Sequence, residues 1–266
     1  MQILIGFLLA ILIALLAWRV GSLSKSGAWA AVLSGGLIFG LGGFPWATLL
    51  LTFFISSSAL SRAFGKRKAS LAEKFAKGNQ RDWGQVLANG GLGAVLAIGF
   101  FIAPQQEWIW LAFAGAMAAV NADTWSTELG VLSSVLPRLI TNGREVERGT
   151  SGGVSLAGTL AAMGGAALVA VAAVSFPPYQ NWLLRLGIII LGGVIGSLFD
   201  SVLGASLQAI YWCPSCSKET ERHPTHICGS ATERLRGWRW LNNDMVNFAC
   251  SMMGAFVAAG LWLLLS

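Results

Sequence analysis

The chain has 266 residues, of which 55% are hydrophobic and only 11% are charged. A typical globular chain carries about 25% charged residues, so this composition excludes an ordinary water-soluble enzyme and indicates a membrane protein. The net charge is +6, and the 33 glycines and 12 tryptophans are typical of closely packed membrane helices with aromatic residues at the interfaces.

Eight segments are long and apolar enough to cross a bilayer core of about 30 Å. They predict an all-α, polytopic integral membrane protein, organised as a single helical domain over residues 1–266. The predicted spans are about 3–19, 28–43, 46–63, 84–103, 108–128, 153–175, 183–210 and 244–265. The second and third segments form a tight pair around Gly42 and Gly43, so a count of six or seven spans is the alternative. The first segment lacks a cleavage site, which predicts a retained span and not a signal peptide.

Basic residues are distributed unevenly over the predicted connections. Every Lys and Arg except Arg185 falls on one set of alternate connections, as is typical of cytoplasmic loops. We therefore expect a multi-pass cell membrane protein with both termini non-cytoplasmic and a cytoplasmic functional face. The expected cytoplasmic loops are about 62–82, 129–152 and 211–242. The basic block from Arg62 to Arg81 is interpreted as a solvated stretch beside anionic lipid, without a catalytic role.

Four carboxylates lie toward the cytoplasmic ends of the predicted spans. They are Asp123, Glu128, Asp200 and Asp244. An ionisable group within a membrane costs several kcal/mol unless it is paired or binds an ion, and Mg²⁺ takes carboxylate, amide and water oxygens. We therefore predict these four as Mg²⁺ ligands, with helix packing and pairing as the alternative.

Small and polar residues recur every fourth position in the seventh span, from Gly192 through Asp200 to Gln208. This spacing forms one helix face that a neighbouring backbone can approach, so Asp200 is predicted to point into protein. Asn121 and Asp123 lie on different faces of the fifth span. If both contribute to one site, the span either uses two of its faces or is an irregular helix between Asn121 and Gly130. Four asparagines are candidate supporting or substrate-contacting residues: Asn89, Asn121, Asn243 and Asn247.

The connection before the sixth span ends in the string REVERGTSGG. Glycines, hydroxyls, arginines and a helix N-terminus together are typical of an anion site, because backbone N–H groups face a phosphate there. A flexible turn is the alternative. No P-loop pattern occurs. The candidate phosphate-binding residues are Arg144, Arg148, Thr150, Ser151 and Gly152.

The last predicted loop contains a Cys-x-x-Cys pair followed by His and Cys residues. Its five potential Zn²⁺ ligands are Cys213, Cys216, His223, His226 and Cys228. A structural Zn²⁺ is one interpretation. Free thiols are preferred, because the spacing does not match a standard zinc finger. Cys250 is predicted to be an inert core residue.

Four strings resemble those of a membrane protein family that includes plant and cyanobacterial phytyl-phosphate kinase and animal transmembrane protein 19. They are NADTWSTELG from Asn121, RGTSGGVS from Arg148, GSLFDSVLG from Gly196 and LNNDMVN from Leu241. The resemblance covers nearly the whole chain. It implies a phosphotransferase that uses a nucleoside triphosphate to convert an isoprenoid (phytyl-like) monophosphate to the diphosphate. The carboxylates add the expectation that this reaction depends on Mg²⁺, with ATP or CTP as the nucleotide.

Two other functions stay open. A CTP-dependent cytidylyltransferase making a CDP-lipid would use similar groups, and an ion or small-anion transporter would also place carboxylates in the membrane. The transporter is disfavoured, because a transport pathway needs polar residues across the whole membrane and here few occur beyond the cytoplasmic half of the spans. The expected partners are a membrane lipid or isoprenoid monophosphate and a nucleotide, with no nucleic acid; the sequence is also compatible with a homodimer.

Overall fold

The structure is a computed structural model that describes residues 1–65, 74, 77–78 and 80–266. Eight α-helices lie within these residues, and each overlaps one predicted span. They are α1 (Gln2–Arg19), α2 (Lys25–Gly42), α3 (Phe44–Phe64), α4 (Trp83–Ile102), α5 (Glu107–Gly130), α6 (Leu156–Val174), α7 (Trp182–Ser206) and α8 (Asn243–Leu265). Six of these described helices, all except α2 and α5, are long and apolar enough to cross a membrane by length and composition.

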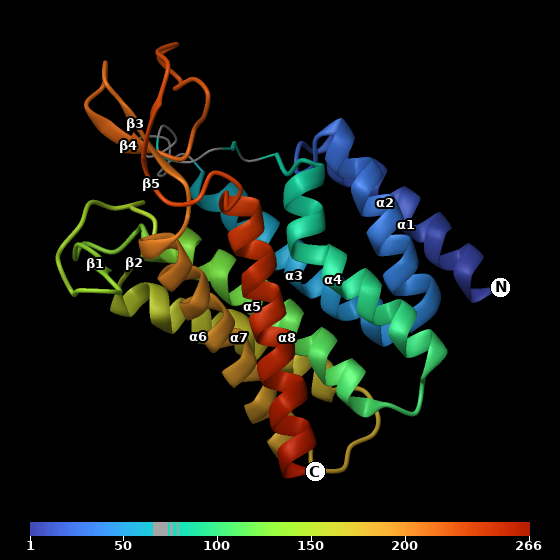
Figure 1. Cartoon of the computed structure of the whole chain (residues 1–266). Coiled ribbons are helices and arrows are strands. Elements are labelled where there is room, and N and C mark those ends of the chain that lie inside the picture. Colours follow the sequence, from blue (N-terminus) through green and yellow to red (C-terminus); the bar gives the residue numbers. More distant parts are fainter. Residues whose placement is uncertain (66–73, 75–76, 79) are drawn as a thin grey trace.

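Helix α5 lies in the middle of the bundle, against α3, α4, α6, α7 and α8 (Figure 1). Residues from Leu111 to Ala122 are buried, so this helix is apolar around its whole circumference, as expected for an enclosed helix. Glycines set its distance from α8, because a Cβ on Gly115 would lie 2.4 Å from the carbonyl oxygen of Gly254. The central helix thereby brings its polar end, from Asn121 to Gly130, against several neighbours.

The predicted glycine face of α7 is present. Gly192 and Gly196 lie against the backbone of α8, and Gly204 lies against Ser151 and Gly152 of the connection before α6. This arrangement confirms that the spacing of four brings neighbouring backbones close to α7.

The predicted helical membrane fold is confirmed, and the connections between its helices contain short strands. β1 (Arg138–Leu139) pairs antiparallel with β2 (Gly153–Val154). A second sheet has the antiparallel order β4-β3-β5, formed by β3 (Ile210–Cys213), β4 (Lys218–Thr220) and β5 (Glu233–Arg236). Helix α7 ends four residues before the predicted limit of residue 210. Arg236 and the Trp238 N–H bond the carbonyls of Gly204 and Leu207 at this helix end, which satisfies groups that would otherwise lack partners.

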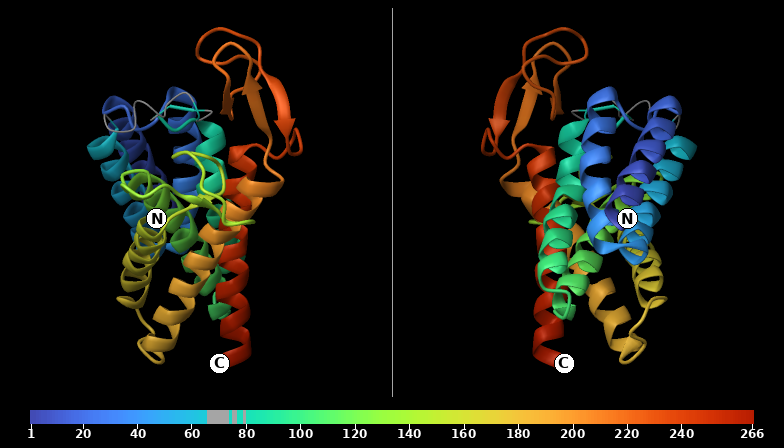
Figure 2. Two further views of the ribbon diagram at one scale, coloured as in Figure 1. Left: turned by 90° about the vertical axis from the view of Figure 1, so that its left-hand side faces the viewer. Right: turned by 90° about the vertical axis from the view of Figure 1, so that its right-hand side faces the viewer.

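The three predicted cytoplasmic loops meet at one end of the bundle. The backbone oxygen of Lys74 accepts a hydrogen bond from the Glu221 N–H at 2.9 Å, and its ammonium group pairs with Glu147 at 2.6 Å. The β3–β5 sheet marks this end, whereas the C-terminus lies at the opposite end (Figure 2). Arg185, the exception in the charge distribution, is buried in α7 and pairs with Glu107 in the first turn of α5.

Candidate functional site

A large polar cavity opens where the three loops meet the helix ends. Its empty volume, including space that is open to solvent, is about 2100 Å³. The predicted site residues on its wall come from five separate parts of the chain: Asn89, Asp123, Glu128, Arg148, Thr150, Ser151, Gly152, Asp200, Asn243 and Asn247. The fold thus gathers in one place groups that are up to 158 residues apart along the chain, from Asn89 to Asn247.

One wall of the cavity is acidic. Asp123 of α5 is hydrogen-bonded to Ser197 of α7, and the charges of Asp123 and Glu221 both act on Asp200. Oxygen Oδ2 of Asp200 is buried and has no hydrogen-bond partner among the described residues. A buried carboxylate oxygen without a partner is costly, and the carboxylates of this group have the donor chemistry that a divalent cation such as Mg²⁺ takes.

Glu128 lies farther along α5 and lines the same cavity. Its carboxylate accepts a hydrogen bond of 2.7 Å from the hydroxyl of Ser61. Asn121, by contrast, is fully buried away from the cavity. It accepts from Ser56 at 2.9 Å and donates to the Gly165 carbonyl at 2.8 Å. Helix α5 therefore uses two faces, and Asn121 joins helices and is not on the cavity wall.

Another part of the cavity wall is the turn before α6, residues 148–153, here called the phosphate turn after the phosphate-binding residues that the sequence predicts in it. Gly149 and Gly152 have φ of 77° and 82°, in the left-handed region that favours glycine. A Cβ on Gly152 would lie 2.4 Å from the backbone nitrogen of Ala205, so this turn packs directly on the end of α7. The turn presents Arg148, Thr150 and Ser151 to the cavity.

A chain of hydrogen bonds joins the two walls. The Ser151 hydroxyl donates to Oε1 of Gln208 at 2.7 Å, and Nε2 of Gln208 donates to Glu221 at 2.9 Å. Gln208 is 1% exposed, so its amide orientation is fixed by these two partners. Arg144 lies outside this arrangement. It is exposed on the β1–β2 connection and is not among the described residues that line the cavity.

Asp244 also differs from its prediction. It is not among the described lining residues, and it forms an ion pair with Lys77. Lys77 also pairs with Asp82 at 2.8 Å. Burial lowers the pKa of Lys77, but hydrogen bonds to Asp244 and Asp82 outweigh it, so the pKa is raised and the lysine stays charged. The neighbouring Asn243 and Asn247 do line the cavity, and Oδ1 of Asp244 is buried without a hydrogen-bond partner among the described residues.

The basic block contains cavity residues, which corrects its interpretation as a solvated stretch. Nη2 of Arg81 donates to Ser57 at 2.8 Å, and its guanidinium lies 5.2 Å from the ring centre of Phe53. Burial lowers the pKa of Arg81 to about 10, opposed by the charge of Glu128, so Arg81 stays charged at neutral pH. The sequence did contain one signal for the role of Arg81. A cation directly before the N-cap Asp82 is repelled by the positive end of the α4 helix dipole, so it needs a stabilising partner elsewhere. The block's Lys66, Arg67 and Lys68 lie outside the described residues.

An apolar cavity adjoins the polar one. It has an empty volume of about 780 Å³ and lies among α1, α2, α3 and α4. Arg81, Gln85 and Asn89 line both cavities. These three residues form the junction between a polar chamber at the bundle end and an apolar space between helices.

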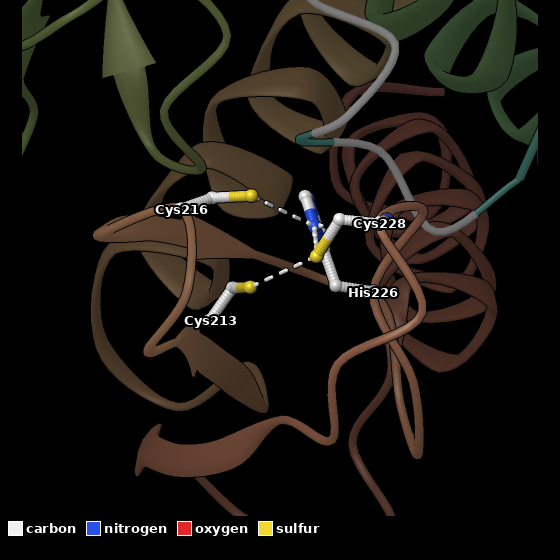
Figure 3. Close-up of side chains that lie close together, drawn as sticks. All are labelled: Cys213, Cys216, His226 and Cys228. Atoms are coloured by element: carbon white, nitrogen blue, oxygen red, sulfur yellow. Dashed lines mark hydrogen bonds between the residues drawn. The ribbon is translucent and has the colours of Figure 1, made fainter.

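Four of the five candidate Zn²⁺ ligands lie together in the β3–β5 module (Figure 3). They are Cys213, Cys216, His226 and Cys228. His223 is separate, since its ring stacks on Tyr211 with 4.4 Å between ring centres. Cys250 is buried in α8, as predicted.

The helices and the cavity define a multi-pass integral membrane protein with a polar site at one end of the bundle. The chain belongs to the family described as integral membrane protein DUF92, whose model matches residues 8–255. It is 32% identical to Protein PGR of Arabidopsis thaliana over 97% of this chain and 95% of that protein.

Two further relatives extend the comparison. The uncharacterized membrane protein MJ0933 of Methanocaldococcus jannaschii is 33% identical over 78% of this chain and 84% of its own length. Protein VTE6, chloroplastic, of Arabidopsis thaliana is 27% identical over 90% of this chain and 65% of its own length. No solved structure matches the chain. The family resemblance predicted from the four strings is confirmed.

Proposed function

We propose that this protein is a membrane-embedded kinase that transfers the terminal phosphate of a nucleoside triphosphate to an isoprenoid monophosphate, giving the diphosphate. The observation that carries this proposal is the junction at Arg81, Gln85 and Asn89, where the apolar cavity meets the polar one. A substrate with an apolar tail and a phosphate head matches both sides of this junction.

The apolar cavity suits the isoprenoid tail. Its walls include Ala10, Ala14, Ala31, Gly35 and Leu50, whose small or aliphatic side chains leave a mainly apolar space among the helices. A branched hydrocarbon chain gains free energy by leaving water for such a space. Arg81 at its mouth would then contact the phosphate of the acceptor, because a guanidinium binds phosphate through paired hydrogen bonds.

The polar cavity suits the triphosphate. Arg148, Thr150 and Ser151 offer a charged group and hydroxyls, and the phosphate turn offers backbone N–H groups. On the acidic wall Asp123 and Asp200, with Glu221 beside them, would hold Mg²⁺; the buried, unpartnered Oδ2 of Asp200 fits this assignment. When bound, Mg²⁺ neutralises charge on the donor phosphates and on the phosphoryl group in transfer.

The acceptor needs little activation. The second pKa of a phosphate monoester is about 6, so the monophosphate is largely dianionic at neutral pH and its oxygen is already a nucleophile. The chain's task is therefore to position two anionic groups against each other and to offset their repulsion. The cationic junction and phosphate turn perform that task. The Lys and Arg excess on the surrounding connections favours a cytoplasmic position for the site.

The reaction can be tested with the purified protein in detergent, supplied with Mg²⁺, ATP or CTP, and phytyl or farnesyl monophosphate. We expect a lipid diphosphate and a nucleoside diphosphate, identified by mass. A CDP-lipid with pyrophosphate would contradict the kinase and favour the cytidylyltransferase. Inorganic phosphate as the acceptor is the control, since it lacks a tail for the apolar cavity.

A further inference from the structure

The β3–β5 module brings four ligand-bearing side chains to one point, as Figure 3 shows. Their ligand atoms all lie within 4.8 Å of one another. Sγ of Cys213 is 3.6 Å from Sγ of Cys228. Nδ1 of His226 is 3.6 Å from Sγ of Cys216 and 3.2 Å from Sγ of Cys228. The four groups therefore surround a common centre and come from two separate segments, 213–216 and 226–228.

These separations match a tetrahedral zinc site. Zn–S bonds of about 2.3 Å and Zn–N bonds of about 2.0–2.1 Å place ligands about 3.8 Å apart between sulfurs and about 3.6 Å apart between sulfur and nitrogen. A disulfide would require about 2.05 Å between sulfurs, and all the described cysteines are free. Three thiols and one imidazole are a ligand set typical of structural Zn²⁺.

The geometry also resolves the choice among five candidate ligands. The ring of His223 lies flat on Tyr211, with 8° between the two ring planes, and is outside the cluster. His226 is 4% exposed and directs Nδ1 at two thiols. The structure therefore identifies His226, and not His223, as the histidine of the cluster, which the sequence spacing alone could not do.

The module needs such a link for its stability. Its three strands have only four, three and four residues, and the connection from β4 to β5 runs over a dozen residues, 221–232. Short sheets with so little core are marginal without a disulfide, metal or further packing. A metal bound by Cys213, Cys216, His226 and Cys228 would fasten that connection to the end of β3.

The same connection supplies part of the polar cavity. Glu221 and Arg222 directly follow β4, and both line the cavity wall. The hydroxyl of Thr232 donates to the Arg222 carbonyl at 3.1 Å, so the segment's two ends are tied to each other. The position of the cavity residues therefore depends on the fold of the module.

We propose that Cys213, Cys216, His226 and Cys228 bind a structural Zn²⁺, and that this ion holds Glu221 and Arg222 at the cavity wall. The four side chains act as ligands, and Glu221 and Arg222 are positioned through them. The metal site does not depend on the kinase proposal, because it is defined by the module alone.

The test is the zinc content of the purified full chain, measured by mass spectrometry of the metals. We expect one zinc ion per chain, lost in Cys228→Ser and His226→Ala. His223→Ala and Cys250→Ser are matched controls that keep the metal. His226→Cys preserves four ligands and is expected to retain zinc, which separates loss of a ligand from a folding defect. Gel filtration in detergent reports whether each variant is folded.

A second readout is the absorbance of the cobalt-substituted protein. We expect intense visible bands typical of a tetrahedral thiolate site, reduced in His226→Ala and unchanged in His223→Ala. Zinc-free wild-type protein in which the thiols of Cys213, Cys216 and Cys228 are all reactive would overturn the proposal. So would a Cys213–Cys228 disulfide in the intact mass, or zinc that is lost in His223→Ala and kept in His226→Ala. None of these readouts uses phosphotransfer, so they fail or succeed independently of the proposed reaction.

Discussion

Ser151 and Gln208 are joined by a hydrogen bond of 2.7 Å between Oγ and Oε1, although they are 57 residues apart. This contact connects the phosphate turn to the residue that follows α7. Gln208 then bonds Glu221 on the acidic wall, so the anion-attracting and cation-attracting sides of the cavity are held at a fixed separation. The proposed reaction depends on that separation.

Replacing Asp200 by Asn removes a buried oxygen assigned to Mg²⁺. We expect Mg²⁺-dependent turnover to fall at least about a thousandfold, because a catalytic metal contributes several kcal/mol. We expect the protein to stay folded, because the asparagine amide has the same size as the aspartate carboxylate and carries no charge that must be buried. Phosphotransfer rates of Asp200→Asn and Asp244→Asn give the comparison. Asp244 pairs with Lys77 and is not among the described residues that line the cavity, so its variant keeps activity within about tenfold of wild type. Equal losses in both variants contradict this metal assignment.

Replacing Arg81 by Gln removes the cation at the junction of the two cavities. We expect KM for the lipid monophosphate to rise about 10- to 100-fold, since a charged hydrogen bond contributes roughly 1.5–3 kcal/mol. KM for the nucleotide changes much less. The matched control is Arg62→Gln, because Arg62 bonds Val20 and Ser22 at the exposed surface. An Arg81→Gln enzyme with a normal lipid KM would remove Arg81 from the site.

Replacing Gly152 by Ala tests the packing of the phosphate turn on α7. Its φ of 82° strains an alanine, and the added Cβ would lie 2.4 Å from the Ala205 nitrogen. We expect loss of nucleotide binding and a destabilisation of roughly 2–5 kcal/mol. Gly143→Ala has similar strain, with φ of 71°, but its Cβ would meet no described atom within 4 Å. For the Gly143→Ala control we expect the free energy of unfolding to fall by only about 1–2 kcal/mol and nucleotide binding to be normal. Melting temperatures and nucleotide titrations of the two variants would be compared, and indistinguishable behaviour would refute the contact.

Replacing Ala31 by Phe narrows the apolar cavity. We expect kcat/KM for phytyl monophosphate to drop about tenfold or more, through a packing penalty of roughly 1–3 kcal/mol, while a short-chain prenyl monophosphate is affected less. Leu33→Phe serves as the control, because Leu33 lies on the same helix and is 56% exposed. If Ala31→Phe changes both substrates equally, the tail occupies another place.

The helices could be predicted closely from the sequence, because apolar length and helix-capping residues are local signals. Asp123, Asp200 and the phosphate turn could be found for a related reason, since carboxylates and a glycine-rich turn are unusual beside membrane helices. The misassigned residues depend on contacts distant in the chain. Lys77 neutralises Asp244 across 167 residues, and Arg81 reaches Ser57 in another helix.

The β3–β5 module shows the same limit. Its strands are too short for a clear period of two, and only tertiary contacts place Glu221 and Arg222 at the cavity. His226 and His223 differ by just three positions, so spacing alone could not separate the ligand from the stacked ring. The sequence indicated a metal-binding composition there, and the fold determined which side chains converge.

The most direct test follows the fate of one phosphate. Purified protein is incubated with Mg²⁺ and phytyl monophosphate, with the nucleoside triphosphate labelled either at the γ-phosphate or at the α-phosphate. A kinase transfers the γ label to the lipid, leaves the α label in the nucleoside diphosphate, and loses this transfer in Asp200→Asn. Appearance of the α label in the lipid, or γ transfer that is unchanged in Asp200→Asn, would contradict the account.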